Sequence, residues 1–131
     1  MITAEVYSDI QIVQGADFTR DIEFDLVDVD QHDWYGTIAK DNKGTSFAHG
    51  STTVTKINFT IVKLDTDSTN SSITISLTPT QTRGFSDDFE GVWDLYSAPD
   101  ADTAKRVRQV QGDVVVSPSV GLSDATFTNL S

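Results

Sequence analysis

The residues of this chain that could carry acid–base or metal chemistry are two histidines and 20 acidic side chains. His32 and His49 both stand in polar, turn-like stretches, and the chain has no cysteine and no G-x-S-x-G motif to present a nucleophilic serine. The eight glycines are scattered singly, so no glycine-rich loop is available to hold a phosphate. We therefore expect two surface histidines, no catalytic site and no enzymatic activity.

Acidic turns are the candidate metal sites. The segment that starts at Asp65 begins like a calcium-binding loop, with Asp67 at the third position, but its sixth residue is Asn70 and its twelfth is Ser76 instead of glutamate. Aspartate is also common in turns because its side chain bonds to the local backbone. We expect no metal or other cofactor, and weak calcium binding stays an open alternative. The other acidic turns contain Asp28, Asp30, Asp33, Asp87, Asp88, Asp100 and Asp102.

The charge of the chain restricts its partners. The formal net charge is −11, from 20 acidic and 9 basic residues. Nucleic-acid binding depends on lysine and arginine to neutralise phosphates, so no nucleic-acid partner is expected. Three basic residues nevertheless cluster near the end of the chain: Lys105, Arg106 and Arg108. This run is either the solvated start of a strand or a docking site for an acidic neighbour.

Alternating apolar and polar residues predict strands. The clearest alternation lies between Asp17 and Leu26, where phenylalanine, isoleucine and leucine alternate with acidic residues. Turn-rich segments separate such runs and helical spacing is almost absent. The sequence therefore predicts an all-β, immunoglobulin-like antiparallel sandwich of about seven strands with one short helix. The predicted strands cover residues 9–14, 18–27, 34–40, 53–62, 72–77, 91–96 and 105–117.

The short helix is predicted after "SSITISL". Thr78 can cap it, Pro79 suits its first position, Gln81 completes a capping box and Gly84 can end it. Two further glycines, Gly15 and Gly112, each follow a Val-Gln pair and are expected to permit a bend or a bulge where a long strand begins or changes partner.

The 131 residues match the size of one domain. We expect residues 1–131 to form a single β-sandwich domain, with an N-terminal arm at residues 1–9 and a C-terminal tail at 119–131 beyond the core. No signal sequence and no run of 18 apolar residues occurs, which predicts no membrane insertion. The apolar residues of the two ends would be exposed on a monomer, so they are predicted partner-binding residues: Ile2, Val6, Phe127 and Leu130.

Trp34 and Tyr35 form an ambiguous aromatic pair. One of them can belong to the core with the other as a partly exposed neighbour, or the pair can stack on a ligand. The sequence pattern leaves both interpretations open.

Several short motifs resemble those of a known group of proteins. They are "QGADFTRDIEF", "WYGTIAK", "ITISLTPTQTRGF", "GVWDLYS" and "QGDVVVSPSV". Their order is similar to that in small Ig-like proteins and domains of tailed phage particles, including the N-terminal domain of baseplate upper proteins. The segment "DQHDWYGT" departs from the Leu-Thr-Gly that commonly precedes the Tyr-Thr strand in that family.

The resemblance implies a non-enzymatic virion structural protein, assembled in the host cytoplasm and most often placed in the tail or baseplate. Its expected partners are other virion proteins and further copies of itself, and the family contributes no catalytic residues. A capsid decoration or head-to-tail connector protein is an alternative within the same particle. A host-surface carbohydrate-binding module, with Trp34 and Tyr35 as its platform, is an alternative of another class.

Overall fold

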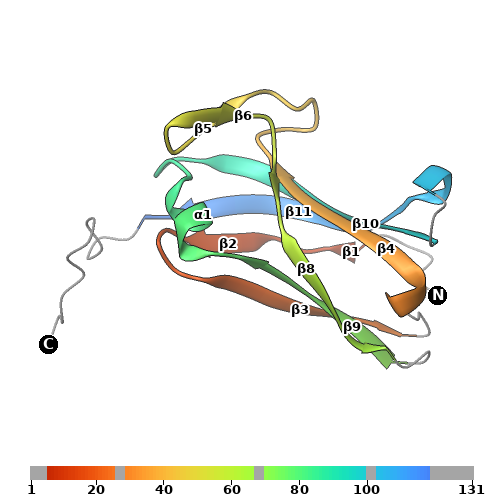
Figure 1. Cartoon of the computed structure of the whole chain (residues 1–131). Coiled ribbons are helices and arrows are strands. Elements are labelled where there is room, and N and C mark those ends of the chain that lie inside the picture. Colours follow the sequence, from red (N-terminus) through yellow and green to blue (C-terminus); the bar gives the residue numbers. More distant parts are fainter. Residues whose placement is uncertain (1–5, 26–28, 67–69, 100–102, 119–131) are drawn as a thin grey trace, which may run out of the picture.

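A computed structural model describes residues 6–25, 29–66, 70–99 and 103–118 of the chain (Figure 1). These ranges contain eleven strands, one short α-helix and two 3-10 turns. The strands are β1 Val6–Tyr7, β2 Ile10–Val13, β3 Phe18–Asp25, β4 His32–Ala39, β5 Phe47–His49, β6 Thr52–Val54, β7 Ile57–Asn58, β8 Thr60–Thr66, β9 Asn70–Leu77, β10 Glu90–Pro99 and β11 Val107–Ser117; the helix α1 is Pro79–Arg83, and the 3-10 turns are η1 Val29–Gln31 and η2 Thr103–Lys105.

The strands form two main sheets that face one another (Figure 1). The larger sheet has the order β1-β11-β10-β4-β7, with β2 also paired to β11, and the smaller sheet has the order β3-β9-β8. Strands β5 and β6 form a separate hairpin. The predicted all-β sandwich with one short helix is therefore confirmed. It is not purely antiparallel, because β1 and β2 both pair with β11 in parallel.

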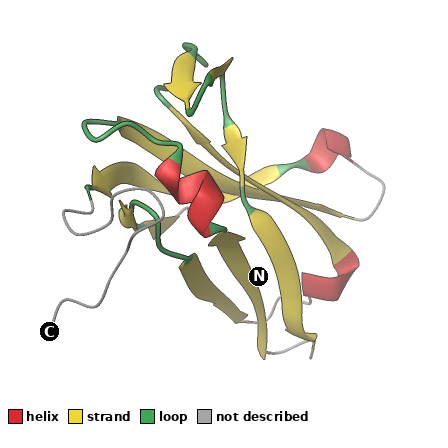
Figure 2. Ribbon diagram, turned by 60° about the vertical axis from the view of Figure 1, so that its left-hand side comes forward, coloured by secondary structure: helices red, strands yellow, loops and turns green. Residues whose placement is uncertain are grey.

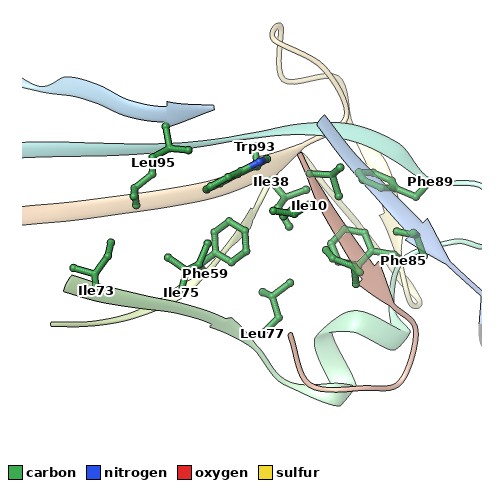
Figure 3. Packing of buried hydrophobic residues seen from close by; sticks show 14 of the residues in the cluster. Ile10, Ile38, Phe59, Ile73, Ile75, Leu77, Phe85, Phe89, Trp93 and Leu95 are labelled. Atoms are coloured by element: carbon green, nitrogen blue, oxygen red, sulfur yellow. The ribbon is translucent and has the colours of Figure 1, made fainter. Parts of the chain in front are cut away.

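The inward-facing side chains of both sheets make one hydrophobic core (Figure 3). Aromatic rings connect the layers. The Phe24 and Trp34 ring centroids are 4.8 Å apart, and Phe59 meets Trp93 edge-on at 5.9 Å. Figure 3 shows the Phe59 ring below Trp93 and beside Ile75. The alternation seen in the sequence thus places one face of β3, β4, β9 and β10 in this core.

The prediction of a single strand at residues 53–62 is wrong. The chain here forms parts of three strands, and it crosses from one sheet to the other. Ile57 pairs with Ile38 in the larger sheet, whereas Val62 pairs with Thr74 in the smaller one. At the crossing, the Phe59 N–H donates to the Gly36 carbonyl at 3.0 Å. The alternation continues through the crossing, so the sequence pattern alone does not reveal it.

Part of the predicted N-terminal arm belongs to the sheet instead. Val6 pairs with Val110, and Tyr7 with Gln111, so the arm does not extend to residue 9. The N-terminal strand then breaks at Ser8, whose N–H donates to the Gln111 carbonyl at 2.8 Å, and β2 begins at Ile10. Residues 1–5 and 119–131 lie outside the described residues.

As expected, β11 changes partner around Gly112, from β1 to β2, but the bulge in this strand lies elsewhere. Leu95 pairs with Val110 and Tyr96 with Arg108, so Gln109 is the extra residue. Gly112 is needed for a close approach, because a Cβ atom at this position would lie 2.0 Å from the Ser8 carbonyl oxygen. That oxygen accepts a 2.7 Å hydrogen bond from Trp93 Nε1.

The predicted capping box is confirmed. Thr78 Oγ1 accepts from the Gln81 N–H at 3.2 Å, and Gln81 Oε1 accepts from the Thr78 N–H at 2.9 Å. Gly84 caps the end of α1 with an ordinary right-handed φ of −70°. Its lack of a side chain matters for another reason, since a Cβ atom would lie 2.5 Å from His49 Nε2.

The helix α1 holds a turn and the hairpin in place (Figure 2). Gly15 adopts a positive φ of 78° and forms the predicted bend. Its N–H donates to Thr82 Oγ1 at 3.0 Å. The neighbouring Gln14 donates from Nε2 to the Phe85 carbonyl at 2.8 Å. On the hairpin side, the Gly50 N–H donates to the Gly84 carbonyl at 2.8 Å. One helical turn therefore joins segments that are distant in sequence.

The close approach at Gly112 yields a stability prediction. We expect Gly112→Ala to lower the free energy of unfolding by about 3 kcal/mol, because the new methyl group meets rigid backbone. Urea unfolding measures the change, and the indole N–H resonance of Trp93 should shift as its bond to Ser8 is lost.

Gly44→Ala is the control for this substitution. Gly44 has a φ of +74° and open space around it, so only backbone strain of about 1 kcal/mol is expected. Equal losses in the two variants would contradict the close-approach explanation.

Candidate functional site

The histidines have packing contacts. His49 Nε2 lies 2.7 Å from the Gln81 carbonyl oxygen, and its ring meets Phe85 edge-on at 5.0 Å. The His32 ring lies 6.3 Å from that of Trp34. Both side chains are half-buried, so each reaches the surface while it packs against its neighbours. Among the described residues, no three His, Asp or Glu side chains are grouped to hold a metal ion.

A concavity with a volume of about 900 Å³ lies on the outer face of the larger sheet. We call it the tyrosine groove. Its floor is formed by β4 and β10, whose outward-facing residues stand in cross-strand register. The groove is lined by Trp34, Tyr35, Gly36, Thr37, Lys56, Asn58, Phe59, Ile61, Asp94, Tyr96, Ala104 and Arg106.

One row of the floor is polar. Asn58, Thr37 and Asp94 are successive cross-strand partners on β7, β4 and β10, and Gln111 of β11 continues the row beside Asp94. The Thr37 hydroxyl donates to Asp94 Oδ1 at 3.2 Å. The row therefore presents hydroxyl, amide and carboxylate groups together.

The adjacent row is aromatic. Tyr35 pairs directly with Tyr96, and Tyr96 pairs with Arg108 on the next strand. The Arg108 guanidinium carbon lies 6.0 Å from the centroid of the Tyr96 ring, within reach of a cation–π interaction. Tyr35 is 40% exposed at the free end of this row. An occupant of the groove would thus meet an aromatic ring and a polar row side by side.

Two walls enclose these rows. Lys56, just before β7, stands on one side, and Ala104 and Arg106 stand on the other side, at the connection between β10 and β11. That connection includes η2, the blue helical turn on the right of Figure 1. Both cationic wall residues are exposed.

The structure separates the ambiguous aromatic pair. The Trp34 ring packs against Phe24, and its Nε1 donates to the Val29 carbonyl at 3.0 Å, so Trp34 is the core neighbour. Tyr35 faces the tyrosine groove. Trp34 also borders the groove, but its ring is held against Phe24, whereas Tyr35 stands beside Tyr96 on the outer face of the sheet. The alternation in "GVWDLYS" already places Asp94 and Tyr96 opposite Trp93, which is the signal that could have identified this face.

The predicted basic run lies at the connection between β10 and β11 and at the start of β11. Lys105 lies in η2, Arg106 lines the groove and Arg108 packs over Tyr96. Val6 is placed by its backbone pairing with Val110, and its side chain is outside the description. The other predicted partner-binding residues lie outside the described residues: Ile2, Phe127 and Leu130.

A second exposed surface covers the smaller sheet. Its outer face consists of three cross-strand rows with serine or threonine in the middle strand, β9. On the edge strand β8, Val62 is 50% exposed and Leu64 is 39% exposed. We call this surface the β8 face. It carries Thr19, Asp21, Glu23, Thr60, Val62, Leu64, Ser72, Thr74 and Ser76.

Comparisons with known proteins give no family assignment. No protein-family model matches the chain, and no curated protein matches it. Within the described ranges, no helix has the length and apolar character needed to cross a membrane.

Asp41 organises the turn after β4, beside the groove. Its carboxylate accepts hydrogen bonds from the Thr45 hydroxyl at 2.7 Å and from the N–H groups of Lys43 at 2.8 Å and Thr45 at 3.3 Å. The Thr45 hydroxyl, followed by these backbone donors, holds the pKa of Asp41 below its usual value of 3.8. The turn is therefore most ordered when this carboxyl is charged.

We expect the Asp41 carboxyl to titrate below 3.8 in an NMR experiment, and Thr45→Val to raise its pKa toward 3.8. Because the folded-state pKa is lowered, the stability from this turn is present above 3.8 and is lost as the pH falls through the folded-state pKa. Thr52→Val is the control, because the Thr52 hydroxyl donates to the His49 carbonyl and not to Asp41. An unchanged Asp41 titration in Thr45→Val would refute this explanation.

Proposed function

We propose that this chain is a non-enzymatic structural protein of a tailed phage particle, a component of the tail or baseplate that works through protein contacts. The observation that carries the contact role is the pair of exposed apolar side chains on the edge strand β8, Val62 and Leu64. Apolar groups gathered at a sheet edge are typical of surfaces that a neighbouring protein covers.

The form of this contact follows from the strand itself. Lys63 stands between Val62 and Leu64 and is exposed, and a charged residue of this kind on an edge strand discourages indiscriminate strand pairing. The β8 face also has a column of small hydroxyl side chains at its centre and the acidic pair Asp21 and Glu23 on β3. We therefore favour packing of side chains against the β8 face over addition of a strand to its edge.

The architecture supports the proposed family. Strands β3, β9 and β8 lie in one sheet and β4, β10 and β11 in the other, an order that corresponds to B-E-D and C-F-G of the immunoglobulin fold. The motifs that carry the resemblance occupy joints of this architecture. The Gln14–Gly15 turn binds Thr82 and Phe85, and "GVWDLYS" forms the central strand β10.

The test combines location with a surface variant. We expect the chain in purified particles of the phage that encodes it, and its position in a map of the particle to fall in the tail or baseplate. The Val62→Ser/Leu64→Ser variant should remain folded, with a loss of about 2 kcal/mol from the buried parts of the two side chains. Its incorporation into particles should fall at least tenfold, as measured by quantitative mass spectrometry.

Val115→Ser is the matched control, because Val115 is 47% exposed but belongs to the larger sheet. Its incorporation should stay at the level of the parent chain. Absence of the chain from particles would overturn the proposed function, whereas a position on capsid faces or at the head-to-tail joint would overturn the tail or baseplate location alone. Normal incorporation of the β8 variant would exclude the β8 face as the contact.

A further inference from the structure

The tyrosine groove has no part in the contact proposed for the β8 face, and its chemistry is specific. In its floor the tyrosine row lies beside the polar row. The two rows are separated by two residues along each of β4 and β10. Rows with this spacing lie about 7 Å apart, because a strand rises about 3.3 Å per residue. A ligand a little larger than one sugar ring would therefore contact both rows at once.

The lining selects among ligand classes. An apolar ligand would cover the polar side chains of Thr37, Asn58 and Asp94 and remove them from water, at a cost in free energy. A nucleic acid is disfavoured by the net charge of −11. A saccharide offers both kinds of complementary surface, since its ring has an apolar C–H face and its hydroxyls donate and accept hydrogen bonds.

The walls indicate the charge of the ligand. The residues that line the groove include two cations, Lys56 and Arg106, against one carboxylate, although acidic residues outnumber basic ones 20 to 9 in the whole chain. That carboxylate, Asp94, already accepts the Thr37 hydroxyl in the floor. Cations on both walls of an otherwise acidic protein are complementary to an anionic group on an occupant.

We propose that the tyrosine groove binds an anionic saccharide. Tyr35 stacks against a sugar ring, the row of Asn58, Thr37 and Asp94 binds its hydroxyls, and Lys56 with Arg106 binds its carboxylate or ester-linked phosphate or sulfate. The packing of Arg108 against Tyr96 holds the aromatic row in position, which leaves Tyr35 as its exposed end. This inference goes beyond the proposed structural role.

The experiment uses trigalacturonic acid as the anionic probe and galactotriose as its neutral counterpart. We expect trigalacturonic acid to bind at low salt in isothermal titration calorimetry and to shift the backbone amide resonances of Tyr35, Asn58 and Asp94. Tyr35→Ala and Arg106→Ala should each weaken binding at least fivefold. Galactotriose should bind at least tenfold more weakly than the anionic probe, and added salt should weaken anionic binding.

Matched controls come from the same chain. Tyr7→Ala removes a more exposed tyrosine, 75% accessible, that does not line the groove, and Arg83→Ala removes an exposed arginine on α1. Both should bind like the parent chain. Equal effects of control and groove variants, or no shift at Tyr35 in the parent chain, would overturn the site.

Two further outcomes also bear on the ligand. Equal binding of galactotriose would overturn the anionic part of the inference. Equally tight binding of hexaglutamate at the same residues would overturn the saccharide and indicate an acidic protein segment as the occupant. None of these results depends on whether the chain is present in particles, so failure here is distinguishable from failure of the proposed function.

Discussion

The hydrogen bond from Trp93 Nε1 to the Ser8 carbonyl oxygen passes across Gly112 of β11 and joins β10 to the link between β1 and β2. Trp93 is the largest fully buried side chain, and its indole N–H would lose its partner in the core if the N-terminal strand moved away. The same bond sets where the N-terminal strand turns inward, so that Ile10 enters the core beside β11. The same backbone arrangement thus gives the Trp93 indole N–H its hydrogen-bond partner and places Ile10 in the core.

This arrangement has consequences at the opposite end of β2. Since β2 is fixed against β11, its last residues deliver the Gln14–Gly15 turn to α1. A helix of five residues is too short to be stable by itself in water. Its stability comes from two contacts. The buried Thr82 hydroxyl accepts a hydrogen bond from the Gly15 N–H of the turn, and His49 of the hairpin contacts the Gln81 carbonyl. The helix is therefore a consequence of the sandwich, although its boundaries are encoded locally.

The difference between local and distant causes explains which features the sequence predicts. The capping box of Thr78 and Gln81 was predictable because its partners lie three residues apart. The role of Gly112 was not, because the carbonyl that crowds it belongs to a residue more than a hundred positions earlier. The tyrosine groove likewise depends on residues that are far apart in the sequence. Tyr35 and Tyr96 become neighbours only through the register of β4 with β10, which no pattern within either strand specifies.

That register also gives the groove its rigidity. Strands β4 and β10 place Ile38 and Leu95 in the core on one face and the groove residues on the other. The buried residues fix the backbone, and the backbone fixes the spacing of the outward side chains. A ligand therefore meets a floor that needs little ordering on binding, which reduces the entropic cost of association. The outward residues themselves contribute little to the core, so their chemistry can vary while the sandwich is retained.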